Sequence, residues 1–329
     1  MRYSFLGRTG VKVSRLALGT MTFGSEADET VAAAIMARAR DAGVNFVDTA
    51  DVYNEGRAEE IVGRLLRGCR DEVVLATKAY YPTGSDPNGR GSSRYHIVRA
   101  LEASLRRLTT DRIDVYYLHH FDDTTHVGES LRALDDLVRQ GKILYPACSN
   151  FAAWQVAHSL GLAAAQGWAR LCAVQPMYNL LRRQVEVEIL PMAEALGIAV
   201  VAYGPTAGGL LSGKYVGGAP RADTRLGSDP MYEARYRDAS NWAAATAFAE
   251  LAAELGKPPA TLAVAWVASH GAVSSVLLGA RTAAQLDETL AAADLFLDPE
   301  VRGRISLLTP APPIATDRSE ERMVPKEAG

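Results

Sequence analysis

Short apolar runs alternate with longer amphipathic stretches along the whole of this 329-residue chain. Eight of the runs have the length and the nearly continuous apolar character of strands that are buried on both faces. They comprise residues 15–19, 45–48, 73–77, 113–118, 143–149, 171–174, 199–203 and 274–278. A strand–helix alternation repeated this often predicts a parallel α/β sheet.

The stretches between these runs have the apolar spacing of helices. Residues 29–43 and 127–141 each end in a glycine, which is a common C-terminal stop. Residues 92–109 follow a Gly/Ser-rich loop and offer serine as an N-cap. The alternation continues through residues 152–167, 185–197 and 282–294.

Two parallel architectures compete for this pattern. A doubly wound dinucleotide-binding sheet normally shows GxGxxG after its first strand, and that string is absent from the chain. Eight strands without it favour a closed (β/α)8 TIM barrel, which commonly forms one domain of this size. We therefore expect a single domain over residues 1–329. Its Pro-rich, charged tail, residues 309–329, could fold over the barrel or remain unfolded.

Composition excludes several classes of protein. The net charge is -3 and Lys and Arg are scattered, which argues against nucleic-acid binding. The N-terminus lacks the apolar segment of a signal peptide, and no uncharged run reaches the roughly 18 residues of a membrane span, so we expect a cytoplasmic protein. The three cysteines form no CxxC and no HExxH occurs, so we expect neither a disulfide framework nor a metal site.

Four polar residues follow neighbouring predicted strands. Asp48 ends the second strand, and Tyr53 comes five residues later. Lys78 follows the third strand and His119 the fourth. Each residue alone has an ordinary structural explanation, such as a helix cap or a packing aromatic. The carboxyl ends of parallel strands meet at one rim of a barrel, so the joint placement predicts an active site.

This set of side chains suits proton transfer to a carbonyl oxygen. Tyrosine has an ordinary pKa of about 10, and a nearby lysine ammonium is expected to lower it. An aspartate keeps the lysine charged, and a neutral histidine can donate a hydrogen bond to the substrate oxygen. None of these groups supplies a hydride, so a cofactor is required.

Two long loops, residues 79–92 and 204–239, also follow strand ends on the predicted active-site side. Together with neighbouring loops they are expected to form the walls of a substrate pocket. The candidates for these walls are Met21, Phe23, Tyr80, Tyr81, His120, Phe121 and Met231.

Several motifs together resemble the aldo-keto reductase superfamily, in its bacterial and potassium-channel-β-like branches. They are LGRTGVKVSRLALGTMTFG, NFVDTADVYNEGRAEEIVG, TKAYY, IDVYYLHHFD and GARTAAQLDETL, and they extend over nearly the whole chain. The resemblance implies a TIM barrel whose bottom is closed by an N-terminal β-hairpin, within residues 1–14. It also implies a catalytic tetrad of Asp48, Tyr53, Lys78 and His119, with Tyr53 as the general acid or base.

The resemblance further implies NADPH or NADP+ as the cofactor. Ser149, Asn150 and Gln175 would hold the nicotinamide carboxamide, and Tyr203 would stack on the ring. Arg281, which precedes a predicted helix, would bind the 2′-phosphate. Thr289 stands where the family often has asparagine, which weakens the expectation of adenine recognition. The other implied cofactor positions are Gly19, Thr20, Met21, Gly204, Pro205, Leu210, Ser212, Lys214, Gly279, Gln285, Glu288 and Thr289.

The expected function is therefore NADP(H)-dependent reduction of an aldehyde or ketone, or oxidation of the corresponding alcohol or sugar. The alternative is a cofactor-binding regulatory module of the channel-β-subunit type with little turnover. The pattern does not rank simple aldehydes, ketones, sugars, pyridoxal-like rings or nucleotide-linked sugars as substrates, and it leaves the oligomeric state open.

Overall fold

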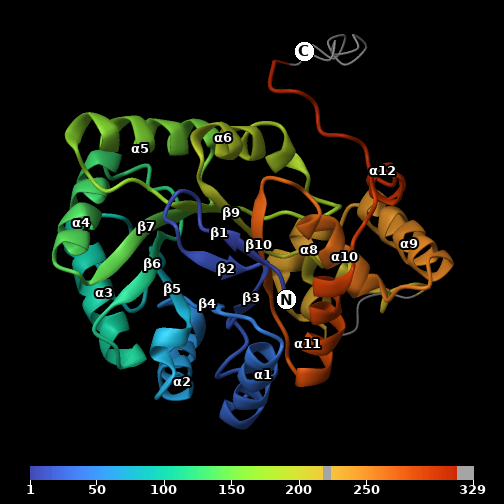
Figure 1. Ribbon diagram of the computed structural model, residues 1–329, viewed down its shortest axis with the longest axis horizontal. Coiled ribbons are helices and arrows are strands. Elements are labelled where there is room, and N and C mark those ends of the chain that lie inside the picture. Colours follow the sequence, from blue (N-terminus) through green and yellow to red (C-terminus); the bar gives the residue numbers. More distant parts are fainter. Residues whose placement is uncertain (218–223, 317–329) are drawn as a thin grey trace.

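The computed structural model describes residues 1–217 and 224–316. Eight parallel strands form a closed barrel, and helices surround it (Figure 1). Each strand pairs with the next one along the chain, and the last pairs with the first. The barrel strands are β3 (Leu16–Gly19), β4 (Phe46–Asp48), β5 (Val74–Ala79), β6 (Ile113–Leu118), β7 (Ile143–Ser149), β8 (Ala173–Gln175), β9 (Ala199–Ala202) and β10 (Val273–Leu278). The predicted (β/α)8 fold is confirmed.

The outer layer contains the predicted helices and several that the sequence pattern did not single out. The predicted ones are α1 (Glu29–Asp41), α3 (Arg94–Leu108), α4 (Val127–Arg139), α5 (Ala153–Gln166), α6 (Ile189–Leu196) and α11 (Ala283–Leu290). The others are α2 (Arg57–Leu65), α9 (Ala239–Glu254), α10 (Pro259–Ala268) and α12 (Pro299–Ser306). In the described part of the chain, no helix has the length and apolarity needed to cross a lipid bilayer.

The strands read as continuously apolar because each face of the barrel wall is buried in a different core. In β6, Val115 and Tyr117 belong to the cluster that fills the barrel. Tyr116 and Leu118 alternate with them and belong to the cluster between the barrel and the helices. All four side chains are at most 2% exposed, as the period of two in a strand requires when both faces are covered.

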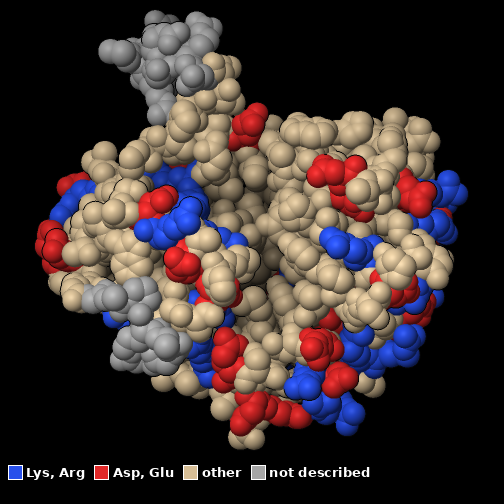
Figure 2. Space-filling model, turned by 180° about the vertical axis from the view of Figure 1, so that it is seen from behind, with Lys and Arg blue, Asp and Glu red and all other residues tan. Residues whose placement is uncertain are grey.

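A hairpin of β1 (Tyr3–Phe5) and β2 (Lys12–Ser14) closes the barrel at the amino ends of its strands. Leu6 and Val13 are fully buried in the interior cluster. Gly7 has a φ of +58°, and a Cβ there would lie only 2.7 Å from the carbonyl oxygen of Cys172. The opposite face is therefore the mouth, and Figure 2 shows that it is hollowed near its centre.

The segment after β9 is more ordered than the expected long loop. It contains η4 (Ala207–Ser212), α7 (Arg225–Ser228) and α8 (Pro230–Tyr236), while residues 218–223 lie outside the described part. Asp229 caps α8 by accepting a hydrogen bond from the amide of Met231, and Pro230 opens the helix. The other predicted loop, which follows β5, has no regular secondary structure. Residues 317–329 of the predicted tail lie outside the described part.

Candidate active site

The four residues of the predicted tetrad lie together at the mouth of the barrel. Asp48 ends β4, Lys78 lies in β5 and His119 directly follows β6. Tyr53 begins the short helix η1 (Tyr53–Gly56). The Lys78 ammonium donates hydrogen bonds to Oδ1 of Asp48 and, at 2.7 Å, to the carbonyl oxygen of Thr49. Its Nζ lies 3.4 Å from the hydroxyl oxygen of Tyr53.

Lys78 is completely buried, and its partners explain how a charge is tolerated there. Burial alone would lower the pKa of Lys78, but Asp48 and Tyr53 outweigh it and the pKa is raised. The lysine is therefore a cation at neutral pH. It is hydrogen-bonded on one side to a carboxylate and faces the phenol on the other.

The expected lowering of the tyrosine pKa is only one contribution in this structure. Lys78 does favour the phenolate of Tyr53, as predicted, but burial opposes ionisation more strongly, so the pKa of Tyr53 is raised. The predicted effect of the lysine is therefore present, but burial outweighs it. The phenol is protonated at neutral pH, which is the form that a general acid requires.

His119 is held in the neutral form. Burial, assisted by the charge of Lys78, lowers the pKa of His119 well below its ordinary value. Its ring centroid lies 6.0 Å from that of Tyr53, nearly perpendicular to it. Nδ1 is buried and has no hydrogen-bond partner among the described residues. A neutral imidazole beside the phenol can donate one hydrogen bond to a substrate oxygen.

The residues expected to hold the nicotinamide form a connected network beside the tetrad. Ser149 ends β7, Gln175 ends β8 and Tyr203 follows β9. Asn150, whose φ is +58°, donates from Nδ2 to the carbonyl oxygen of His119 at 2.9 Å. The hydroxyl of Tyr203 donates to Oδ1 of Asn150 at 2.8 Å, which fixes the orientation of the aromatic ring.

Ser149 and Gln175 are hydrogen-bonded to each other, and Gln175 is also hydrogen-bonded to the tetrad. Nε2 of Gln175 donates to Oδ2 of Asp48 at 2.9 Å, and the Ser149 hydroxyl donates to the carbonyl oxygen of Gln175 at the same distance. Thr20 directly follows β3, and its hydroxyl donates a hydrogen bond of 3.0 Å to the carbonyl oxygen of Asp48. Neighbouring Gly19 is half-buried and Met21 is 37% exposed.

The loop expected to hold the pyrophosphate follows Gly204 and Pro205 and forms η4. Gly208 and Gly209 have φ values of +68° and +96°, which L-residues rarely adopt. The Ser212 hydroxyl donates to the carbonyl oxygen of Gly209 at 2.7 Å, and Lys214 is exposed. Leu210 is only 2% exposed, so its side chain packs in the core and only its backbone is available to a ligand.

Two guanidinium groups converge on one carboxylate at the expected adenosine end. Arg281 and Arg225 lie 3.6 Å and 3.5 Å from the same oxygen of Glu26. The amide of Arg281 donates to Oε1 of Gln285 at 2.9 Å, just before α11 begins. Two arginines around one anion are the donor set that a phosphate group needs, so the residues present fit the implied 2′-phosphate.

The remaining residues expected at the adenosine end differ in their exposure and in their hydrogen bonds. Gly279 and Glu288 are exposed. The Thr289 hydroxyl instead donates to the carbonyl oxygens of Leu286 and Gln285 in its own helix, at 3.0 and 3.3 Å, and the residue is 8% exposed. The expected contact of Thr289 with the cofactor is therefore not supported, because the helix itself satisfies this hydroxyl.

Three of the expected pocket residues form an aromatic cluster around His119. The ring of Tyr81 lies 5.0 Å from His119, and the ring of Tyr80 lies 5.2 Å from both Tyr81 and His120. Met231, on α8, is 53% exposed. Phe23 is different, because it is fully buried in the core between the barrel and the helices. A side chain with no exposed surface in that core is no pocket wall.

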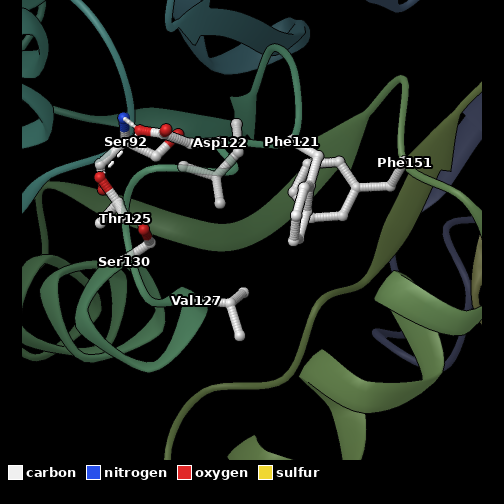
Figure 3. Close-up of a pocket in the computed structure, with 8 residues that line it drawn as sticks. Ser92, Phe121, Asp122, Thr125, Val127, Ser130 and Phe151 are labelled. Atoms are coloured by element: carbon white, nitrogen blue, oxygen red, sulfur yellow. Dashed lines mark hydrogen bonds between the residues drawn. The ribbon is translucent and has the colours of Figure 1, made fainter.

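Phe121 also lies elsewhere than expected. Its ring packs edge-on against Phe151 at 5.1 Å and against Trp154 at 6.0 Å. Figure 3 shows Phe121 and Phe151 on one side of a small pocket, with Ser92 and Asp122 on the other. Asp122 accepts a hydrogen bond of 2.6 Å from the amide of Ser92, which ties the loop after β5 to the loop after β6. Phe121 thus supports these loops.

Sequence reasoning missed the residues that α7 and α8 bring to this face, namely Arg225, Tyr232 and Arg235, and also Glu26. Tyr232 is close enough to Tyr53 for its hydroxyl to contribute to the raised pKa of that residue. The sequence does show aromatic and arginine residues alternating in MYEARYR. That signal does not reveal which way the segment folds.

Comparisons with known proteins match nearly the whole chain. Residues 15–308 match the model of the aldo/keto reductase family. The "Uncharacterized oxidoreductase YrpG" of Bacillus subtilis (strain 168) is 40% identical over 95% of this chain and 97% of its own length. The "Probable voltage-gated potassium channel subunit beta" of Oryza sativa subsp. japonica is 38% identical over 96% and 99%. The "Versiconal hemiacetal acetate reductase" of Aspergillus parasiticus is 33% identical over 91% and 94%. The chain belongs to the aldo/keto reductase family of oxidoreductases.

Proposed function

We propose that this protein is an NADP(H)-dependent oxidoreductase that reduces an aldehyde or ketone, or oxidises the corresponding alcohol or sugar. The observation that carries the proposal is the position of the buried Lys78 ammonium between the Asp48 carboxylate and the Tyr53 hydroxyl. NADPH, when bound, would supply the hydride. The protein's own groups would supply the proton and orient the carbonyl.

In this proposal Tyr53 protonates the carbonyl oxygen during reduction and accepts the proton during oxidation. Lys78 stabilises the phenolate that Tyr53 becomes after it gives up the proton, and Asp48 keeps Lys78 charged and in place. His119, neutral at the pH of the reaction, donates a hydrogen bond to the same oxygen and polarises the carbonyl.

For the cofactor, Ser149, Asn150 and Gln175 are the proposed partners of the carboxamide, and Tyr203 the stacking surface. Arg281 is the proposed partner of the 2′-phosphate. The pair of arginines around Glu26 supports NADP(H) over NAD(H), because a phosphate monoester can take over the role of the Glu26 carboxylate between them.

The test compares the wild type, Tyr53→Phe and Tyr95→Phe in two assays. Consumption of NADPH is followed with a panel of aldehydes, and cofactor binding is followed by fluorescence quenching. We expect Tyr53→Phe to lose at least about 100-fold in kcat while binding NADPH normally, since general acid–base catalysis contributes on that order. Tyr95, 60% exposed on α3, is the matched control. Full turnover by Tyr53→Phe would contradict the assignment.

A second function has specific support from three relatives that carry the words "voltage-gated potassium channel subunit beta" in their names. On that alternative the chain is a cofactor-binding regulatory module. Tight NADPH binding without turnover on any aldehyde, ketone or alcohol would favour it over the reductase. Turnover that depends on Tyr53 would favour the reductase.

A further inference from the structure

The helix α8 lies beside the segments that follow β8 and β9, at the carboxyl ends of the strands, and its tyrosines attach it there. The ring of Tyr232 packs on Gly208, where a Cβ would come within 2.7 Å of it. The Tyr236 hydroxyl accepts a hydrogen bond of 3.1 Å from Nδ2 of Asn179, which also donates to the carbonyl oxygen of Gly204 at 2.9 Å. These contacts tie α8 to the ends of β8 and β9.

Arg235 lies on this helix beside the ring of Tyr232, and its charge acts on two further tyrosines at the mouth. Burial raises the pKa of Tyr203 to about 12, and Arg235 opposes that increase. Arg235 likewise opposes the increase in the pKa of Tyr81. Tyr81 follows β5 and Tyr203 follows β9, and these strands are diametrically opposite in the eight-stranded barrel. Both hydroxyls therefore lie within the electrostatic range of the Arg235 guanidinium.

Within residues 1–217 and 224–316, the charge of Arg235 has no carboxylate partner. No ion pair among the described residues includes Arg235, whose guanidinium instead lies 5.1 Å from the ring centroid of Tyr232. Arg225, whose guanidinium lies 5.2 Å from the centroid of the same ring, does have a carboxylate partner in Glu26. Arg235 is also half-buried, so it has lost part of its hydration without gaining a counter-ion from the described part of the chain.

The mouth beneath Arg235 already contains the groups that would hold the carbonyl end of a substrate. Tyr81 stacks edge-on against His119 at 5.0 Å, and His119 adjoins Tyr53. A substrate whose carbonyl oxygen lies at Tyr53 and His119 would fill the mouth beside α8, the helix that carries Arg235. The planar, five-donor guanidinium matches the geometry of a carboxylate or phosphate.

We propose that Arg235 is the substrate-specificity residue of this enzyme and that its preferred substrates are aldehydes or ketones carrying a carboxylate or phosphate group. This inference rests on the proposed reductase function. The ring of Tyr232, with its centroid 5.1 Å from the guanidinium, helps to orient it.

The test measures kcat/KM for matched pairs of substrates with the wild type, Arg235→Gln, Arg235→Lys and Arg237→Gln. One pair is 4-carboxybenzaldehyde and its neutral methyl ester, and the other is glyceraldehyde 3-phosphate and glyceraldehyde. Arg237 is exposed and two positions away, so it controls for the general loss of one positive charge from this segment.

We expect the wild type to favour the anionic member of at least one pair, and the favoured pair identifies carboxylate or phosphate as the recognised group. Arg235→Gln should reduce that preference by about 10-fold or more, mainly through KM, because a charge-assisted hydrogen bond is lost. Arg235→Lys should retain part of it, and Arg237→Gln all of it. Raised ionic strength should weaken the preference in the wild type.

The proposal is overturned if Arg235→Gln lowers kcat/KM equally for the anionic and neutral members, since Arg235 would then only support Tyr232. It is also overturned if the wild type shows no preference in either pair. In both cases turnover of the neutral aldehydes still demonstrates a reductase. Absence of turnover on every substrate, with NADPH bound, would instead contradict the proposed function itself.

Discussion

Nε2 of Gln175 donates a hydrogen bond of 2.9 Å to Oδ2 of Asp48, across the interior of the barrel. Asp48 uses its other oxygen, Oδ1, to accept from Lys78. Gln175 therefore links the proposed nicotinamide site to the carboxylate that orients the lysine. Its amide is 3% exposed, so no water compensates if it is removed.

Gln175→Leu should destabilise the protein by about 1–3 kcal/mol, because a buried carboxylate oxygen loses its donor. It should also weaken NADPH binding, since Gln175 is a proposed carboxamide partner. Urea unfolding and fluorescence titration measure the two effects. Gln140→Leu, at an exposed position after α4, is the control and should change stability by less than about 0.5 kcal/mol. An unchanged unfolding midpoint in Gln175→Leu would argue against the link.

Arg281→Ala should weaken NADPH binding by about 10-fold or more, because it removes a charge-assisted contact with the 2′-phosphate. NADH lacks that phosphate and should bind nearly as it does to the wild type. Parallel titrations with both cofactors give the ratio. Arg132→Ala, an exposed arginine on α4, should leave both affinities unchanged. Equal losses for the two cofactors would exclude the 2′-phosphate role.

In Asp51→Asn, the free energy of unfolding should fall less with rising pH than it does in the wild type. Asp51 is 2% exposed and neither carboxylate oxygen has a hydrogen-bond partner among the described residues. Burial, together with the charge of Glu59, raises the pKa of Asp51 from 3.8 to about 8. Between these values the folded protein retains a proton that the unfolded chain has released. The free energy of unfolding therefore falls as pH rises through this window, by at most about 1.4 kcal/mol per pH unit.

Urea unfolding at pH 5 and pH 8 measures this effect. The wild type should lose more stability between the two values than Asp51→Asn does. Asp111→Asn, at an exposed position, should behave as the wild type. If Asp51→Asn and the wild type lose the same amount, the carboxyl of Asp51 titrates at an ordinary pKa.

Two helical glycines should respond to alanine with opposite signs. A Cβ on Gly63, in α2, would lie 2.6 Å from the carbonyl oxygen of Leu108, at the end of α3. Gly63→Ala should therefore force the helices apart and destabilise the fold by about 1–3 kcal/mol. Gly161, in α5, has nothing within 4 Å of its Cβ position. Gly161→Ala should stabilise the protein by about 0.5–1 kcal/mol. Thermal unfolding gives both signs, and a stabilised Gly63→Ala would mean that α2 and α3 can separate freely.

The sequence by itself determined the barrel and the strand ends at which the proposed catalytic residues lie. Eight apolar runs predicted all eight strands, because a strand covered on both faces has little room for polar residues. Asp48, Lys78 and His119 were identifiable because each interrupts this pattern at the carboxyl end of a strand, where the topology makes neighbouring strand ends converge. Family resemblance added the residues expected to contact the cofactor.

Only the tertiary structure decided which of several similar residues face the mouth. Phe23 and Phe121 are aromatic residues of the kind that line pockets. Phe23 is nevertheless buried in the outer core, and Phe121 supports the loops around Asp122. Tyr232 and Arg235 lie in a segment without long periodicity, and they reach the mouth because α8 folds back over the ends of β8 and β9. The tyrosine pKa likewise depended on the balance between burial and Lys78, and burial is a property of the packed molecule that no local sequence pattern contains.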